Sequence, residues 1–201
     1  MSAPNICPAG YHCPVGSQTP IPCPVGTYNP VTGGTSVLTG TDSLGFPIYD
    51  TSIYCLKCPP GKYCATTGLT APTGNCAAGY YCLESSPVSN PSARDAAWGR
   101  WDKCPFGSYC PEGTATPYPC PRGTYGASQG LTTAAGCTPC DAGYYCETRN
   151  LTAVTGPCDA GFYCPAGEYR PRQYAYRCTA GNYCVAGSTA MTPCEGGFYQ
   201  H

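Results

Sequence analysis

Regularly spaced cysteines dominate the chemistry available to this 201-residue chain, which contains 19 of them. The pattern Cys-x-x-Gly-x-x-Cys occurs seven times, with copies beginning at Cys7, Cys58, Cys76, Cys104, Cys140, Cys158 and Cys178. The residue before the second cysteine is tyrosine in six copies and His12 in the first. Three further copies lack the second cysteine and begin at Cys23, Cys120 and Cys194. So many thiols at fixed intervals indicate a disulfide framework.

Metal binding is the other chemistry that cysteines offer, and the spacing does not favour it. Two pairs have the Cys-x2-Cys spacing of zinc ligands, namely Cys55 with Cys58 and Cys137 with Cys140. A structural zinc site needs four ligands close together. These pairs stand 82 residues apart at equivalent places of a repeat, and the chain has only two histidines. We therefore interpret both pairs as junctions between modules.

Calcium binding and catalysis also lack the residues that they need. Asp141 and Asp159 follow cysteines at equivalent places, but no Asp-x-Asp loop clusters oxygen ligands as calcium requires. Asp42 and Asp50 flank a loop without a nearby base, and two histidines leave few Ser/His or Cys/His arrangements. We expect no metal, no cofactor and no enzymatic activity.

The composition excludes several classes of protein. Glycine and proline supply 26 and 23 residues, whereas Leu, Ile, Val and Phe together supply only 22, too few for one large hydrophobic core. A net charge of −1 argues against nucleic-acid binding, and no apolar run is long enough to cross a membrane. Because this many disulfides would be reduced in the cytosol, we expect an extracellular protein, secreted or on the cell surface.

The cysteines divide the chain into modules of two alternating types. Type A reads Cys-x5-Cys-x9-Cys followed by a variable loop and a closing cysteine, and type B reads Cys-x5-Cys-x11-Cys-x5-Cys. We predict type A modules at 1–57 (with a long insert at 29–54), 104–139 and 178–201, type B modules at 58–82 and 140–164, and linkers at 83–103 and 165–177. The last module is incomplete, so we expect the array to continue or a neighbouring chain to supply the missing thiol.

The repeated motif predicts a fold class. Proline after the first cysteine fixes φ, and glycine three residues after each first cysteine supplies a turn with positive φ. Outside the linkers, no stretch shows helical apolar spacing free of glycine and proline. We predict a small disulfide-rich repeat array, irregular with short β-hairpins and little or no helix, in which tandem modules form an elongated rod.

Three disulfide schemes fit the spacing, and each leaves one cysteine unpaired. Closing each heptapeptide on itself leaves Cys194, pairing each second cysteine with the next first one leaves Cys7, and pairing within groups of four leaves Cys184. We favour the last, because it makes every group an interlocked module. It pairs Cys7–Cys23, Cys13–Cys55, Cys58–Cys76, Cys64–Cys82, Cys104–Cys120, Cys110–Cys137, Cys140–Cys158, Cys146–Cys164 and Cys178–Cys194, with Cys184 unpaired or bonded outside the chain.

The stretch from Cys104 to Tyr125 reads Cys-Pro-x-Gly-x-Tyr-Cys-Pro-x-Gly-Thr-x-Thr-Pro-x-Pro-Cys-Pro-x-Gly-Thr-Tyr, and the stretch from Cys7 to Tyr28 nearly matches it. It resembles the ephrin-receptor-like cysteine-rich repeat, which is related in style to tumour-necrosis-factor-receptor and epidermal-growth-factor-like modules. The resemblance covers the chain except 29–54, 83–103 and 165–177. It implies a multi-module extracellular protein, but such modules serve as spacers, adhesins and receptors alike.

The two linkers hold most of the side chains suited to protein contacts. Five of the seven arginines and both tryptophans lie there, and Trp, Tyr and Arg are enriched at interface hot spots. The candidates are Arg94, Trp98, Arg100 and Trp101 in the first linker and Tyr169, Arg170, Arg172, Tyr174 and Tyr176 in the second. They either brace successive modules of one chain or contact a neighbouring chain, and the sequence leaves both readings open.

Two further features complete the sequence-based expectations. In the insert 29–54, Val37 and Leu38 with Ile48 to Tyr54 predict an extra hairpin whose edge is able to pair with a neighbour. Asn150-Leu-Thr152 is an N-glycosylation sequon.

The leading functional hypothesis is a structural repeat protein that forms a fibre, filament or cell-surface coat, with copies of itself as the main partner. The alternative is the stalk or ligand-binding ectodomain of a receptor or adhesin, with a surface protein or glycan as partner. Neither hypothesis involves nucleic acid or membrane insertion of this segment.

Overall fold

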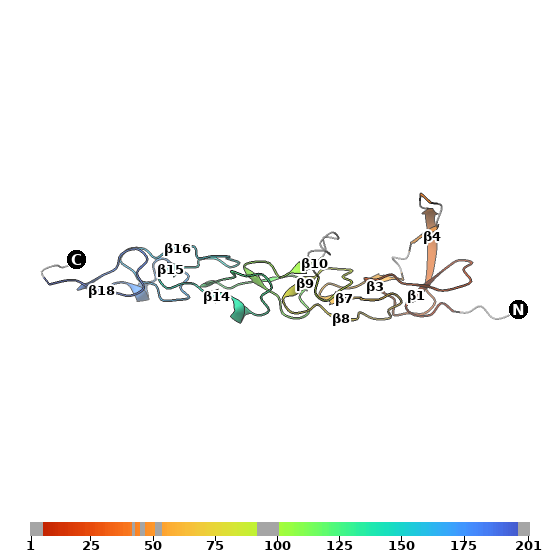
Figure 1. Ribbon diagram of the computed structural model, residues 1–201, viewed down its shortest axis with the longest axis horizontal. Helices are drawn as coiled ribbons and strands as arrows, with labels where there is room; N and C mark the ends of the chain where they lie inside the picture. The colour runs from red at the N-terminus through yellow and green to blue at the C-terminus, as the bar shows by residue number, and fades with distance from the viewer. Residues whose placement is uncertain (1–5, 42, 45–46, 51–53, 92–100, 197–201) are drawn as a thin grey trace. The chain divides into compact units, whose positions relative to one another are not determined.

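The computed structural model describes residues 6–41, 43–44, 47–50, 54–91 and 101–196 (Figure 1). These residues form short β-strands joined by turns, with two three-residue 3-10 helices and no α-helix among them. The chain divides into two compact units, one of 1–103 with 112–116 and the other of 104–111 with 117–201. The predicted irregular array of short hairpins is confirmed for both units.

The first unit has one four-stranded sheet and three two-stranded sheets. The larger sheet has the order β2-β1-β4-β5, and the pairs are β3-β6, β7-β8 and β9-β10. Strand bounds are β1 Tyr11–Pro14, β2 Ile21–Pro22, β3 Thr27–Tyr28, β4 Thr35–Thr41, β5 Pro47–Asp50, β6 Leu56–Lys57, β7 Lys62–Tyr63, β8 Gly74–Asn75, β9 Tyr80–Cys82 and β10 Trp101–Lys103.

The second unit has four two-stranded sheets, β11-β12, β13-β14, β15-β16 and β17-β18. Its strands are β11 Ser108–Tyr109, β12 Tyr118–Pro119, β13 Thr124–Tyr125, β14 Thr138–Pro139, β15 Tyr144–Tyr145, β16 Gly156–Pro157, β17 Asn182–Tyr183 and β18 Thr192–Pro193. The 3-10 helices are η2 Ala134–Gly136 and η3 Tyr174–Tyr176.

One rule generates nearly all of these hairpins. The fifth and sixth residues of each heptapeptide pair antiparallel with the two residues before the first cysteine of the next, as Ser108 pairs with Pro119 and Tyr109 with Tyr118. The same register recurs from β1-β2 through β17-β18, and at Phe162 it is a single bridge to Arg177. Each segment between two heptapeptides is therefore bounded by a pair of this kind, and the described part of the long insert adds strands β4 and β5.

Each heptapeptide closes on itself through its own disulfide. Its glycine has a positive φ, 79° at Gly61 for example, and the next N–H donates back to the second residue, as Lys62 does to Pro59 over 3.1 Å. This turn brings the two cysteine Cα atoms to 5.9 Å in the copy formed by Cys58 and Cys64, within the range that a disulfide requires. The same pairing joins Cys7–Cys13, Cys58–Cys64, Cys76–Cys82, Cys104–Cys110, Cys140–Cys146, Cys158–Cys164 and Cys178–Cys184.

The favoured disulfide prediction is therefore wrong, because the turn inside each heptapeptide already brings the two ends together. None of the predicted bonds is present: Cys7–Cys23, Cys13–Cys55, Cys58–Cys76, Cys64–Cys82, Cys104–Cys120, Cys110–Cys137, Cys140–Cys158, Cys146–Cys164 and Cys178–Cys194. Of the three heptapeptides without a second cysteine, two bond instead to a later cysteine, Cys23 to Cys55 and Cys120 to Cys137. Cys184 is bonded, and the free thiol is Cys194.

Within each unit, backbone hydrogen bonds tie successive heptapeptides together through the glycine. The Gly61 N–H donates to the carbonyl oxygen of Cys82, and its own carbonyl accepts from the N–H of Cys76, both over 2.8 Å. The same pair of bonds recurs at Gly26, Gly123, Gly143 and Gly161. The bonds of Gly26 and Gly123 cross predicted module boundaries, from 1–57 to 58–82 and from 104–139 to 140–164. Successive modules within a unit therefore share one continuous set of backbone bonds, which we call the ladder.

A second set of bonds comes from left-handed residues in the hairpin loops. The carbonyl of each first cysteine from Cys7 to Cys158 accepts an N–H from the loop after the following heptapeptide. The donors are Gly33, Gly68, Ser85, Gly113, Gly130, Asn150, Gly167 and Gly187, and all have positive φ. Glycine has no Cβ and adopts this conformation without a steric clash, which explains its use at six of the eight places.

In six of the heptapeptides the glycine is also needed for space, whereas a Cβ added at Gly161 or Gly181 would meet nothing within 4 Å. A Cβ added at Gly61 would lie 2.3 Å from the carbonyl oxygen of Gly113, and one at Gly143 would lie 2.4 Å from that of Gly187. Both approaches are to backbone that cannot move without breaking the ladder. In these six copies glycine is therefore required for two reasons, its positive φ and the close approach of a backbone carbonyl from a later hairpin loop.

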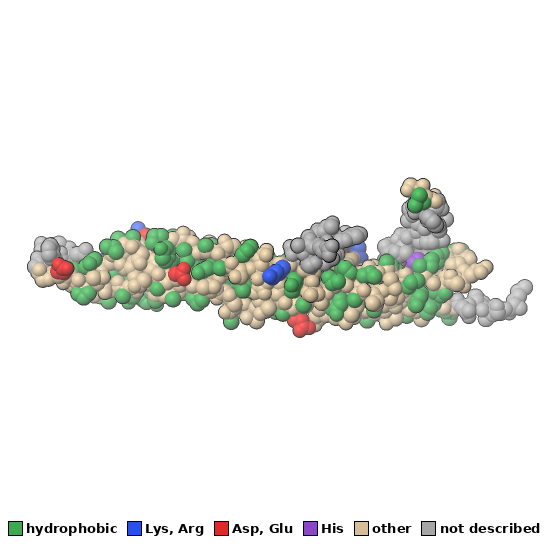
Figure 2. Space-filling view, viewed as in Figure 1, with side chains coloured by type: hydrophobic (Ala, Val, Ile, Leu, Met, Phe, Trp, Pro, Cys, Tyr) green, Lys and Arg blue, Asp and Glu red, His purple; other side chains and the backbone are tan. Residues whose placement is uncertain are grey.

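The interior of the array is made of sulfur and backbone rather than of aliphatic side chains. Most bonded cysteines are fully buried, while Val15, Ile6 and Val185 are largely exposed. Figure 2 shows hydrophobic and uncharged groups over most of the visible surface with few charges. Each disulfide contributes roughly 2–4 kcal/mol, which offsets chain entropy that the small apolar core does not.

The predicted extra hairpin in the insert is confirmed. Strand β4 runs antiparallel to β5, with Val37 opposite Asp50 and Leu38 opposite Tyr49, and β4 also pairs in parallel with β1. Figure 1 shows β4 standing out from the neighbouring β1 and β3 of the first unit. Of the predicted segment, residues 51–53 lie outside the described part of the chain.

His12 occupies the tyrosine position of the first heptapeptide and is buried. Burial penalises the charged imidazolium and so lowers the pKa of His12 below its usual range. The side chain therefore acts here as a neutral ring in place of the tyrosine that the other copies use.

Candidate functional site

The second linker, 165–177, is the best described of the predicted contact segments, and part of it binds the same chain. Helix η3 ends with Tyr176, whose carbonyl accepts the N–H of Tyr163 over 3.0 Å. The rings of Tyr163 and Tyr176 lie 5.4 Å apart between centroids and are tilted by 58°. Tyr176 is thus an internal brace, as one of the two sequence interpretations expected.

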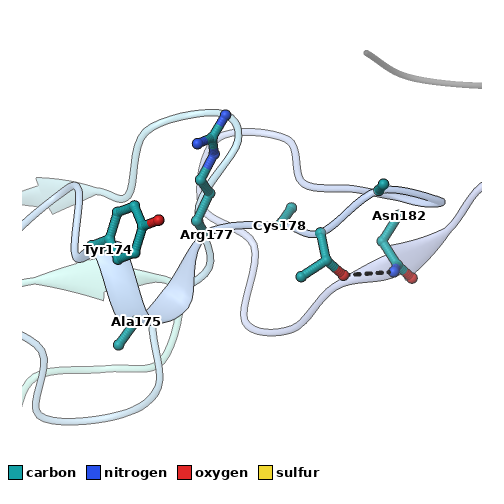
Figure 3. A pocket seen from close by; sticks show the side chains of 7 residues that line it. Tyr174, Ala175, Arg177, Cys178 and Asn182 are labelled. Atoms are coloured by element: carbon teal, nitrogen blue, oxygen red, sulfur yellow. Dashed lines mark hydrogen bonds between the residues drawn. The ribbon is translucent and has the colours of Figure 1, made fainter.

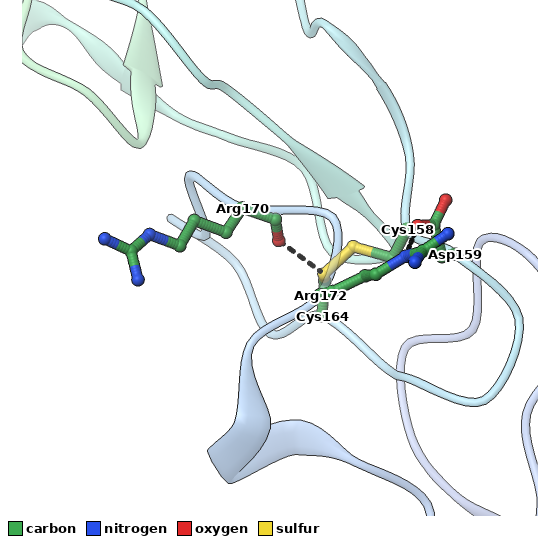
Figure 4. Close-up of polar contacts among 5 residues, drawn as sticks. All are labelled: Cys158, Asp159, Cys164, Arg170 and Arg172. Atoms are coloured by element: carbon green, nitrogen blue, oxygen red, sulfur yellow. Dashed lines mark hydrogen bonds and ion pairs between the residues drawn. A yellow bond between two sulfur atoms is a disulfide. The ribbon is translucent and has the colours of Figure 1, made fainter.

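Arg172 also binds within the chain. Its Nε forms an ion pair with Oδ2 of Asp159, and the Asp159 N–H donates to the carbonyl of Pro171 over 3.1 Å. Figure 4 shows this pair on one side of the Cys158–Cys164 disulfide, while the guanidinium of Arg170 points away from it. The loop is therefore fixed to the heptapeptide that precedes it.

Glu168 is a residue that sequence reasoning missed. Its side chain is buried, and Oε1 accepts the N–H groups of Tyr169 and Arg170 over 2.8 and 3.2 Å. Its carbonyl accepts the N–H of Cys146 as part of the ladder. No sequence signal pointed to Glu168, because the partners of its side chain are backbone N–H groups.

Arg170, Tyr174 and Arg177 of this linker face solvent, whereas Tyr169 is half-buried. Tyr174 is 85% exposed, and Arg170 is exposed with its guanidinium carbon 5.0 Å from the ring centroid of Tyr169. Among the described residues, neither Arg170 nor Arg177 has an ion-pair partner. These aromatic and cationic groups are available for contact with another molecule.

A hollow of about 600 Å³ opens beside Tyr174. Its lining comes from η3 and the following heptapeptide: Tyr174, Ala175, Arg177, Cys178, Thr179, Ala180 and Asn182. Figure 3 shows the Tyr174 ring and Arg177 on one side and Asn182 on the other. Nδ2 of Asn182 donates to Oγ1 of Thr179 over 3.2 Å. The groups combine an aromatic ring, a cation and an amide, which suits contact with polar protein or carbohydrate surfaces.

The first linker is less fully described. Strand β10 pairs antiparallel with β9, so the backbone of Trp101 lies opposite Cys82 of the same chain. Arg94, Trp98 and Arg100 lie outside the described residues.

The side chains that the sequence analysis considered as metal ligands have other partners in the structure. Cys55, Cys58, Cys137 and Cys140 each belong to a disulfide. Asp159 is ion-paired with Arg172, and the hydroxyl of Tyr125 lies 3.5 Å from Oδ2 of Asp141. Within the described part of the chain, no three His, Cys, Asp or Glu side chains are grouped to hold a metal ion.

Comparison with known proteins gives one partial match and no family. No protein-family model matches the chain. The chain is similar to ABC transporter G family member 25 of Oryza sativa subsp. japonica, with 34% identity over an alignment of 98 residues. The alignment covers 40% of this chain. The matched stretch is 9% of that protein, so the chain spans less than a tenth of the relative.

The chain is thus a disulfide-rich, cysteine-rich repeat protein. Its nine disulfides fit an oxidising location and an extracellular or secreted module. In the described residues, no helix has the length and apolarity that a membrane crossing needs.

Proposed function

We propose that this chain is an extracellular structural array, a subunit of a fibre, filament or cell-surface coat that acts without enzymatic activity. The observation that carries the proposal is the ladder, in which Gly61, Gly123 and their equivalents bond successive heptapeptides within each unit. Backbone bonds recur along each unit, and disulfides close the individual heptapeptides. A pulling force is therefore spread over many bonds. This construction suits a load-bearing or protective role.

Self-contact through the linkers is the proposed route of assembly. Tyr174, Arg170 and Arg177 are exposed, whereas Tyr176 and Arg172 are committed to the same chain. Tyrosine supplies a large contact area at a low cost in conformational entropy, and arginine supplies several hydrogen-bond donors. Low net charge allows copies to approach without strong repulsion.

We further propose that the repeat is of the ephrin-receptor-like type, on the motif from Cys104 to Tyr125. The alternative function is the stalk or ectodomain of a surface protein. The similarity to part of an ABC transporter supports it, because a transporter is a membrane protein and the matched stretch is a small fraction of its length. On that reading the exposed linker residues contact a surface protein or glycan rather than another copy.

Negative-stain microscopy of the oxidised, secreted chain over a concentration series distinguishes the two functions. Assembly predicts filaments or ordered bundles that are lost in Tyr174→Ala and in Trp98→Ala with Trp101→Ala. Tyr144→Ala is the matched control, because Tyr144 is 41% exposed but stands within a heptapeptide. Separate particles at every concentration would exclude self-assembly by this segment and favour the ectodomain.

A further inference from the structure

The sequon asparagine, Asn150, holds one of the eight left-handed loop positions of the ladder. Its φ is 63°, and its N–H donates to the carbonyl of Cys120 over 3.1 Å. Six of the other seven positions use glycine and one uses Ser85. Asparagine tolerates this conformation better than most residues, but it gains nothing over glycine from the backbone alone.

The side chain of Asn150 is held at one end only. Oδ1 accepts a hydrogen bond of 2.8 Å from Oγ of Ser108, and Nδ2 makes no hydrogen bond to any described residue. Asn150 and Thr152 are both exposed. The half of the amide that glycosylation modifies is thus the half that the fold leaves unused.

We propose that Asn150 carries an N-linked glycan. Nδ2 loses one proton and forms a C–N bond to the anomeric carbon of a lipid-linked oligosaccharide, whose lipid pyrophosphate leaves. The carbonyl oxygen of the amide is unchanged by this step, so the bond from Ser108 persists in the glycosylated chain. The backbone bond to Cys120 is equally unaffected.

The geometry makes the modification compatible with the ladder. The Asn150 carbonyl passes the Gly107 backbone, where an added Cβ would lie 2.6 Å from the carbonyl oxygen. Because the backbone and Oδ1 of Asn150 lie close to Gly107, a glycan on Asn150 fits only if it extends from Nδ2 into solvent. A glycan so placed keeps other chains away from the surface around Ser108 and Asn150.

The test is intact-mass and peptide mass spectrometry of the chain secreted from a eukaryotic cell. Most molecules are expected to lose the mass of one glycan on treatment with a peptide amidase that removes N-glycans, with Asn150 converted to aspartate. Thr152→Ala removes the sequon and keeps Asn150, so it should abolish the mass loss. Asn150→Gly should abolish it too and remain secreted, because glycine serves at six equivalent positions.

Two results would overturn the proposal. One is a secreted, correctly disulfide-bonded chain whose mass does not change on treatment. The other is a glycan that persists in Thr152→Ala or Asn150→Gly. Ser108→Ala is a further control, since it removes the bond to Oδ1 but leaves the sequon and should keep the glycan.

Discussion

The side-chain amide of Asn29 donates a hydrogen bond of 2.8 Å to the backbone carbonyl oxygen of Tyr11. Asn29 stands where other heptapeptides have their second cysteine, and it is fully buried. Its Oδ1 also accepts the N–H of Val31 over 3.0 Å. Here hydrogen bonds replace the short disulfide, because Cys23 bonds to Cys55 instead.

Asn29→Ala should therefore destabilise the first unit. It removes two hydrogen bonds and leaves the buried carbonyl of Tyr11 without this donor, a loss of about 2 kcal/mol. Urea unfolding of the oxidised chain, compared with the unmodified sequence, measures the loss. Asn75→Ala is the control, because Asn75 is exposed and bonds only to exposed Glu112, and it should change stability little. Equal effects of both variants would show that burial of Asn29 is unimportant.

The double role of the heptapeptide glycine predicts unequal costs for the same substitution. Gly61→Ala places a Cβ against the Gly113 carbonyl and should cost about 4 kcal/mol or prevent secretion. Gly16→Ala has a similar φ of 82° but meets nothing within 4 Å, so it should cost about 1–2 kcal/mol. Unfolding midpoints and secreted yields test the ranking, and similar costs would contradict the steric argument.

Tryptic digestion of the denatured, unreduced chain tests the disulfide map. Cleavage after Arg149 and Arg172 should release fragment 150–172 without reduction, because Cys158 bonds to Cys164 within it. Under the pairing favoured from the sequence, Cys158 and Cys164 would hold this fragment to the one before it. Release of fragment 150–172 only after reduction would therefore support the pairing favoured from the sequence and contradict the Cys158–Cys164 bond.

Removal of the Cys120–Cys137 disulfide and removal of the Cys194 thiol should have different effects on stability. Replacing both Cys120 and Cys137 with serine opens a loop of 17 residues and should cost roughly 3 kcal/mol. Cys194→Ser removes no bond and should leave the urea midpoint unchanged. A thiol reagent should label one cysteine in the native chain and none in Cys194→Ser. Labelling that persists in this variant would place the free thiol elsewhere.

Burial of His12 predicts that acid weakens the first unit. Because the pKa of His12 is lowered on folding, the unfolded chain binds more protons as the pH falls below the ordinary histidine pKa of about 6.5. The stabilisation is complete above that pH and is lost as the pH falls through the lowered pKa. His12→Tyr, which restores the residue of the other copies, should reduce this dependence between pH 7.5 and about 5. An unchanged dependence would assign it to other groups.

The sequence by itself determined the repeat, its chemistry and its local turns. The positive φ of the heptapeptide glycines follows from their fixed place between cysteines, and the described copies all have it. The scarcity of helix followed from glycine and proline, and the extra hairpin in the insert from the apolar residues Val37 and Leu38 and the segment from Ile48 to Tyr54. These are local properties, set by residues close together in the chain.

Only the tertiary structure decided which cysteines pair and what the linkers do. Disulfide choice depends on the distance between Cα atoms, and that distance follows from a turn whose closure the spacing Cys-x5-Cys does not reveal. Asn29, Glu168 and Asn150 bond to backbone groups 18, 22 and 30 residues away, at Tyr11, Cys146 and Cys120. Such partners are set by the stacking of one heptapeptide on the next, because backbone groups carry no sequence signal of their own.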